Sequence, residues 1–260
     1  MSGGELPERA HLAVPAVGHE HFNTNFIRTA VCELRFPTLH EIDDGKPPLR
    51  FAHALRKDYP AHVLASGVNV SAGAMAKSKT HVFTSRNALW TINLSTQALS
   101  LETSRYNSFE DFEERIAQLI DASLSFIDTD FFTRVGIRYV NVLPYERQNI
   151  AEWVNPSLVG DLAAGLYGDC TEFSGSVRGT TEVGGFLLQH GIGQSSNAPN
   201  SPTAATGGYG LDFDFYCENV EVGQATVVIQ GLHKRQFEMF LWSLGPRALE
   251  KLRSAGARRV

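Results

Sequence analysis

The chain is short of cysteine, with only Cys32, Cys170 and Cys217 among 260 residues. No two of them have the Cys-x-x-Cys spacing of a zinc or redox motif. Each lies in an apolar run, where a cysteine usually packs as a small hydrophobic residue. Because unpaired thiols suit a reducing compartment, we expect a cytoplasmic protein.

Other absences exclude whole classes of function. The formal net charge of −5 argues against a general nucleic-acid binder. No stretch reaches the ~18 apolar residues that cross a bilayer, and residues 1–9 lack the features of a signal peptide, so we expect no membrane association. A P-loop, a Gly-x-Ser-x-Gly elbow and a His-Glu-x-x-His motif are missing, and we predict no cofactor.

The clearest pattern that is present indicates a long helix. Apolar residues recur at spacings of three and four between Phe109 and Ile127, which predicts one amphipathic helix. Ser108 with Asp111 fits a capping box at its start. Acidic residues crowd the first turns, where the helix dipole favours negative charge, so a structural reading explains them better than a metal site does.

A long alternating strand follows this helix over residues 131–143. Period two places Val135 and Tyr139 on the face that packs against the helix. Arg134, Gly136 and Arg138 fall on the opposite face, where two guanidinium groups flank a residue without a side chain. Such a place admits an anion or a neighbouring backbone, or the arginines pair with acidic residues on adjacent strands.

The remaining pattern predicts an α+β fold: an antiparallel β-meander sheet with two long helices packed on one face, or two similar β-hairpin-plus-helix lobes. We expect a flexible leader at 1–24, a first unit at 25–144 and a second unit at 145–260 packed with the first as one body. The loop 191–208, rich in Gly, Ser and Asn, is expected to be disordered. Further expected elements are strands at 26–36, 62–70, 170–177, 184–191 and 209–218, three short strands within 80–103, a loop at 71–79, and helices at 49–57, 224–244 and 247–253.

A resemblance to a known family is carried by the strand Phe132-Thr133-Arg134-Val135-Gly136-Ile137-Arg138-Tyr139-Val140-Asn141. It is similar to the hallmark segment of a sporadically distributed, uncharacterised prokaryotic family of similar length. Segments 31–37 and 99–103, with Tyr106 and Phe112, and a late helix around Leu232-His233 and Phe237, resemble that family in the same order. The resemblance implies a shared fold and a bacterial source, and it brings no known reaction or catalytic residue.

Charged residues on alternating strand positions form the candidate site. The anion-binding candidates are Arg134, Arg138 and Arg35, and the metal candidates are Asp212, Asp214 and Glu33. If these residues line one concave sheet, a divalent cation and a phosphate group could bind there, as in enzymes that cleave triphosphates. The same residues can also neutralise one another as ordinary cross-strand pairs. The trio His233-Lys234-Arg235 is read as solvated helix surface.

No organised catalytic constellation emerges from the sequence. We therefore expect a non-catalytic protein that acts through contact with an unknown protein partner, as an accessory component of a mobile or defence-related locus. The alternative is a metal-dependent triphosphate or nucleotide phosphohydrolase, or an anion-binding protein, that uses the Arg134/Arg138 and Asp212/Asp214 strand faces. Sequence does not reveal the oligomeric state.

Overall fold

The computed structural model describes residues 12–18, 20, 22, 24–40, 42, 45–71, 74–193 and 208–254, with side chains left aside at 68–71, 74–78 and 147. Its centre is a nine-stranded antiparallel sheet in the order β2-β3-β4-β5-β1-β6-β9-β8-β7. The predicted α+β class with an antiparallel sheet is confirmed. The strands are β1 (Ile27–Arg35), β2 (Ala61–Ser71), β3 (Ala74–Thr84), β4 (Trp90–Leu94), β5 (Ala98–Thr103), β6 (Phe131–Pro144), β7 (Phe173–Thr180), β8 (Gly185–Ile192) and β9 (Gly208–Glu221).

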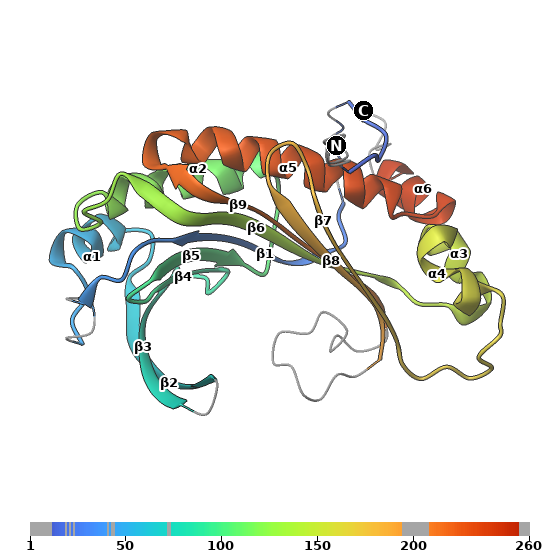
Figure 1. The fold of residues 1–260 in the computed structure, drawn as a ribbon, viewed down its shortest axis with the longest axis horizontal. Coiled ribbons are helices and arrows are strands. Elements are labelled where there is room, and N and C mark those ends of the chain that lie inside the picture. The colour runs from blue at the N-terminus through green and yellow to red at the C-terminus, as the bar shows by residue number, and fades with distance from the viewer. Residues whose placement is uncertain are drawn as a thin grey trace, which may run out of the picture.

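The sheet is bent into an arch, and helices lie on its convex side (Figure 1). The described residues form six α-helices, so the two long ones, α2 and α5, are accompanied by four shorter ones. They are α1 (Leu49–Leu55), α2 (Phe109–Ser123), α3 (Ile150–Trp153), α4 (Pro156–Ala163), α5 (Ala225–Trp242) and α6 (Pro246–Ser254). The short 3-10 turns Arg147–Asn149 and Val222–Gln224 precede α3 and α5.

Local sequence explains the two longest helices. The Ser108 side chain accepts a hydrogen bond from the Asp111 backbone amide at 3.3 Å, which satisfies one free donor at the start of α2. The apolar stripe of α2 is buried, as predicted, at Phe112, Ile116 and Leu119. The buried face of α5 includes two polar residues, Gln236 and Glu238, beside Ile229, Leu232 and Met239.

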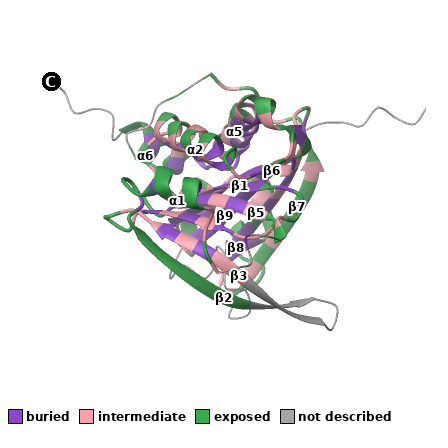
Figure 2. Ribbon diagram, turned by 90° about the vertical axis from the view of Figure 1, so that its left-hand side faces the viewer, coloured by how far each residue is buried: buried purple, intermediate pink, exposed green. Residues whose placement is uncertain are grey.

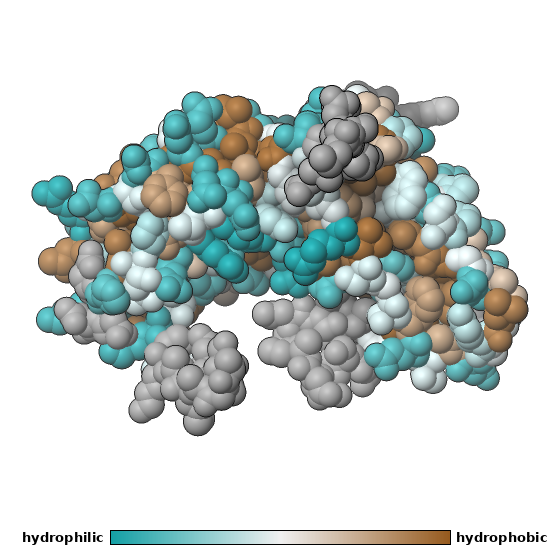
Figure 3. All heavy atoms as spheres, in the orientation of Figure 1, coloured by the Kyte–Doolittle hydropathy of each residue, from teal (hydrophilic) through white to brown (hydrophobic). Residues whose placement is uncertain are grey.

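Alternation along the strands separates two faces of the sheet. Leu34, Ile137 and Phe215 are fully buried on the face that the helices cover. Their sequence neighbours point to the concave side, which carries the charged residues of the candidate site. Figure 3 shows hydrophilic side chains gathered in the middle of the molecule, under the arch. One sheet runs through both predicted units, because β9 of the second pairs with β6 of the first along its whole length.

Three predicted segments need comment. The loop expected at 71–79 is wrong for its described residues, because β2 includes Ser71 and β3 begins at Ala74. The predicted leader 1–24 is in part packed on the body: Leu12 and Phe22 contact the core, and the Leu12 N–H donates to the Thr180 carbonyl at 3.0 Å. Most of the loop predicted at 191–208 lies outside the described residues.

Candidate functional site

The concave face of the sheet brings the predicted site residues together at its centre. Glu33 and Arg35 of β1 lie opposite Gly136 and Arg134 of β6, and Arg138 lies opposite Asp214 of β9. They surround a hollow of about 180 Å³. The sequence left open whether these residues share a face, and the register of β1, β6 and β9 places them on one.

Arg134 is held by two carboxylates. Its Nη2 donates to both carboxylate oxygens of Asp214 at 2.8 Å, and its Nη1 donates to Glu33 at 3.2 Å. The guanidinium also lies 4.6 Å from the centre of the Tyr216 ring, a cation–π contact. A Cβ atom at position 136 would lie 2.7 Å from Arg134 Nη1, so Gly136 leaves the room that this guanidinium occupies.

Arg138 forms the most buried ion pair of this face. It donates through Nε and Nη2 to the two oxygens of Asp212 at 2.8 and 2.6 Å, a bidentate geometry. The Asp212 side chain is only 3% exposed, against 31% for Arg138. Burial raises the pKa of Asp212, and Arg138 opposes that rise. The buried Asp212 carboxylate is therefore held in place by its bidentate contact with Arg138.

Arg35 completes the set at the edge of the hollow, where its Nε donates to Glu33 at 2.7 Å. All three arginines predicted as anion ligands thus have carboxylate partners, and all three predicted metal ligands accept hydrogen bonds from arginine. The cross-strand pairing of Arg134 and Arg138 with acidic residues is confirmed, whereas Arg35 pairs with Glu33 of its own strand. Within the described part of the chain, no three His, Cys, Asp or Glu side chains lie together in a way that could hold a metal ion.

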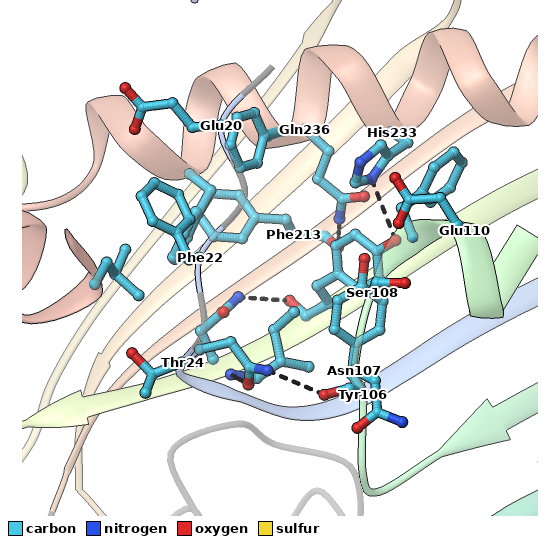
Figure 4. A pocket seen from close by; sticks show the side chains of 18 residues that line it. Glu20, Phe22, Thr24, Tyr106, Asn107, Ser108, Glu110, Phe213, His233 and Gln236 are labelled. Atoms are coloured by element: carbon cyan, nitrogen blue, oxygen red, sulfur yellow. Dashed lines mark hydrogen bonds between the residues drawn. The ribbon is translucent and has the colours of Figure 1, made fainter. Parts of the chain in front are cut away.

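A second cavity, of about 130 Å³, lies on the opposite, helix-covered face of the same strands. Figure 4 shows His233 and Gln236 reaching it from α5, and Tyr106, Asn107 and Ser108 from the segment that leads into α2. Glu20 and Phe22 approach from the segment before β1. Seven of its eighteen lining residues are phenylalanine or tyrosine: Phe22, Tyr106, Phe109, Tyr139, Phe213, Phe237 and Phe240.

His233 is fixed at the wall of this cavity by ring contacts. Its imidazole stacks on Phe109 of α2, with ring centres 3.7 Å apart and planes 3° from parallel. Its Nδ1 lies 3.3 Å from the Tyr139 hydroxyl, so α5, α2 and β6 meet there. Burial raises the pKa of Tyr139 well above its ordinary value and also raises that of Tyr106. Both phenols are therefore neutral hydrogen-bonding groups at physiological pH.

Two amide side chains of the cavity wall have an oxygen without a partner. Asn141 is 2% exposed and Gln236 is 1% exposed. Their amide nitrogens donate to backbone carbonyls: Asn141 to Tyr139 and Leu211 at 3.4 Å, and Gln236 to Phe213 at 2.6 Å. Asn141 Oδ1 and Gln236 Oε1 have no hydrogen-bond partner within the described residues. A buried oxygen without a hydrogen-bond partner lowers the stability of the fold, so its presence calls for an explanation such as a functional site.

Sequence reasoning missed this cavity. His233 was placed on solvated helix surface, which is wrong, and Arg235 beside it is also half-buried, with Glu182 as a partner at 2.8 Å. A signal was present, because His233 lies four residues after Ile229 and four before Phe237, on the flank of the apolar stripe. The segments that carry the family resemblance include Tyr106, Tyr139, His233 and Phe237, yet the resemblance named no role for them.

The edge strand β2 is a third feature of interest. Residues 61–67 are all exposed, Val63 to 60% and Leu64 to 39%, and Figure 2 shows this strand along the outer edge of the sheet. Its eleven residues include no Lys, Arg, Asp, Glu or Pro. Proteins usually protect edge strands with such residues. The opposite edge, β7, carries Arg178, and its last residue is bound by Leu12.

Comparison with protein-family models and with curated proteins gives no match. The resemblance stated from the sequence therefore stays a prediction. Among the helices of the described residues, none is both long and apolar enough to cross a membrane.

Proposed function

We propose that this chain is a non-catalytic interaction protein that binds an extended segment of a partner protein as a further strand beside β2. The observation that carries the proposal is the unprotected edge: eleven residues without a charge or a proline, exposed from residue 61 to residue 67. An edge of this kind offers a row of backbone donors and acceptors to an incoming strand.

The chemistry of β2 defines the partner segment. Val63 lies opposite Val82, and that row of residues continues to Asn93, Ser100 and Glu33 on the concave face. Ala61 and Ala65 flank Val63 on the same face by period two. Since cross-strand neighbours of like character stabilise a pair, the segment that fits is uncharged and rich in β-branched residues.

A partner segment fits better than a second copy of the chain. Twisted open sheets rarely exceed about ten strands, and this sheet already has nine. Pairing of β2 with its counterpart in a second copy would double that number, whereas one added strand stays within the usual range. We infer a cytoplasmic, bacterial setting, supported by the three free cysteines and by the stated resemblance.

The test compares two edge substitutions. Affinity purification from extracts of the source organism is run with the wild type, Val63→Lys on β2 and the matched control Val177→Lys on β7, whose side chain is 44% exposed. We expect a stoichiometric partner with the wild type and with Val177→Lys, and its loss with Val63→Lys. The proposal is overturned if no stoichiometric partner is recovered, if Val63→Lys retains it, or if light scattering shows a wild-type dimer that Val63→Lys abolishes.

A second candidate function is the phosphohydrolase or anion-binding activity of the concave face. The observation in its favour is that Glu33, Arg35, Arg134, Arg138 and Asp214 converge on one hollow. Against it stands the engagement of each guanidinium by carboxylate oxygens. Nucleotides and polyphosphate are incubated with the protein and Mg²⁺ or Mn²⁺, and released phosphate is measured. Turnover that is lost in Arg134→Ala supports this function; no turnover, or turnover unchanged in that variant, removes it.

A further inference from the structure

A third hollow, of about 290 Å³, lies where β6 ends and where β1 and β9 begin. It is bordered by Lys251 of α6 and by the strand residues Val142, Leu143, Pro144 and Gly208. Among the residues that the structure describes, it shares none with the concave hollow and takes none from β2. It is therefore a separate place from the partner edge and from the ion-paired cluster.

The charged groups that border this hollow are both cations. Among its ten described lining residues, Arg28 and Lys251 are charged, and none is Asp or Glu. The Arg28 side chain forms no hydrogen bond or ion pair within the described part of the chain, whereas Arg134 and Arg138 on the concave face are each engaged by carboxylates. In a chain with a net charge of −5, a hollow bordered only by cations attracts anions locally.

A β-bulge places Arg28 at the hollow. Ile27 pairs with Asn141 and Thr29 pairs with Val140, so Arg28 is the extra residue of β1 between two paired positions. A bulge bends its strand and re-aims a side chain, and bulges are common next to active sites. Arg28 is exposed, so its guanidinium can offer its donors to a ligand in the hollow.

Lys251 reaches the hollow from α6. Its Nζ lies 5.9 Å from the centre of the Phe26 ring, a cation–π contact that leaves N–H donors for a ligand. Lys251 also borders a neighbouring hollow with Glu146 and Glu250, but it forms an ion pair with neither of these described residues. Glu146 is paired instead with Arg247 at 3.1 Å. The ammonium charge of Lys251 is therefore available to an anion.

The other walls and the volume define the body of the ligand. Half of the ten described lining residues are apolar: Phe26, Ile27, Val142, Leu143 and Pro144. The volume is about twice the roughly 150 Å³ of an engineered cavity that holds benzene, so one ring and a phosphate group can enter together. A phosphate monoester carries about −1.5 to −2 charges at pH 7, which matches two cations, whereas a carboxylate carries a single charge.

We propose that this hollow binds a small organic phosphate monoester. The phosphate lies between Arg28 and Lys251, and an apolar body of about one ring lies against Ile27, Val142 and Pro144. Arginine offers a planar fork of donors to phosphate oxygens, and lysine offers a compact charge. The ester is bound without a bond-breaking step, and the proposal does not depend on the partner strand at β2.

The first experiment compares probes that differ in charge and in body. Phenyl phosphate, benzoate, benzylamine and inorganic phosphate are titrated into the full chain by calorimetry at low salt. We expect phenyl phosphate to bind at least about threefold more tightly than benzoate or inorganic phosphate, and benzylamine not to bind. The proposal is overturned if phenyl phosphate does not bind, if benzylamine binds, or if benzoate or inorganic phosphate binds as tightly as phenyl phosphate.

The second experiment changes the charge of the probe through the pH. A phosphate monoester takes up a proton with a pKa of about 6, so phenyl phosphate should bind more weakly as the pH falls from about 7 to about 5. Benzoate should bind equally across this range, because a carboxyl group has a pKa near about 4. An affinity for phenyl phosphate that is the same at both pH values contradicts the pairing of a dianion with two cations.

The third experiment uses matched cations. Arg28→Gln and Lys251→Gln each remove one cation of the hollow, and Arg56→Gln and Lys57→Gln remove exposed cations just after α1, outside it. We expect the first two to weaken phenyl phosphate between about threefold and about tenfold, and the controls to change nothing. Equal effects of Arg28→Gln and Arg56→Gln would show general charge attraction and overturn the site. Loss of binding in Arg134→Ala without loss in Arg28→Gln would place the phosphate on the concave face and also overturn it.

Discussion

The two faces of strand β6 use polar side chains in opposite ways. On the concave face, Arg134 and Arg138 each bind carboxylates, and every charged group of the predicted site has a partner. On the helix-covered face, three positions beyond Arg138 along the strand, Asn141 carries a buried oxygen without one among the described residues. A satisfied network stabilises and orders a sheet, whereas an unsatisfied buried atom is retained at a cost in stability. A cluster of charged side chains is therefore, by itself, a poor guide to the position of a functional site.

The largest expected effect comes from breaking the buried pair of the concave face. Arg138→Ala leaves the Asp212 carboxylate, 3% exposed, without its bidentate partner. We expect the free energy of unfolding to fall by about 3 kcal/mol, because an uncompensated buried charge is costly. Urea denaturation measures it. Arg35→Ala is the matched control, since Arg35 is 53% exposed and Glu33 retains Arg134, and it should change stability by less than about 0.5 kcal/mol.

The same substitution predicts a pH dependence with a definite sign. Burial raises the pKa of Asp212 and Arg138 opposes that rise, so removing Arg138 raises the pKa further. The stability difference between Arg138→Ala and the wild type should then shrink as the pH falls toward about 4, because the stranded carboxyl takes up a proton. If Arg138→Ala is as stable as the wild type and releases phosphate at a different rate, the polar groups of the concave face serve function and not stability. The comparison of the two faces would then be wrong.

A smaller effect of opposite sign is expected on the helix-covered face. Asn141→Leu removes an unpartnered oxygen and gives up two long hydrogen bonds of 3.4 Å, while the adjacent cavity accommodates the larger side chain. We expect stability to be unchanged or to rise by about 1 kcal/mol. Asn93→Leu, which loses a bond to Ser100 at 3.3 Å, should not gain stability. A loss of more than about 2 kcal/mol in Asn141→Leu would mean that this amide is structural.

Sequence patterns reached further on one face of the sheet than on the other. Period two places Arg134 and Arg138 in one charged row, and Asp212 and Asp214 in another, so each row could be predicted. That the two rows share a face depends on the pairing of β6 with β9, which period two does not determine. The cavity requires the packing of α5 on α2 and β6: the Tyr139–His233 contact joins residues 94 apart in the chain. No local pattern encodes that distance.

The β2–β3 hairpin shows a second limit. Composition between residues 71 and 79, with Ala, Gly, Ser and Lys, is typical of a loop, yet the strands continue through it with unbroken register from Ala61–Thr84 to Ser71–Ala74. Backbone pairing with a neighbouring strand supplies the stabilisation that side-chain propensity lacks there.

The smallest expected effect concerns a buried polar group of the helix-covered face that has a partner. It tests whether such a group behaves differently from the unpartnered oxygens on the same face. His190 of β8 is buried outside the cavity and its Nδ1 lies 2.6 Å from the Tyr209 hydroxyl, so it is a buried polar group with a partner. Burial lowers its pKa. The native state therefore binds fewer protons than the unfolded state below about pH 6.5, and this contribution to stability is lost as the pH falls from there.

His190→Gln should flatten the part of the stability–pH profile between about pH 7 and pH 5 that this histidine causes, while Tyr209→Phe should keep it, because burial and not the hydroxyl lowers the pKa. Thermal unfolding across that range measures both. If Tyr209→Phe flattens the profile as well, the hydrogen bond controls the titration.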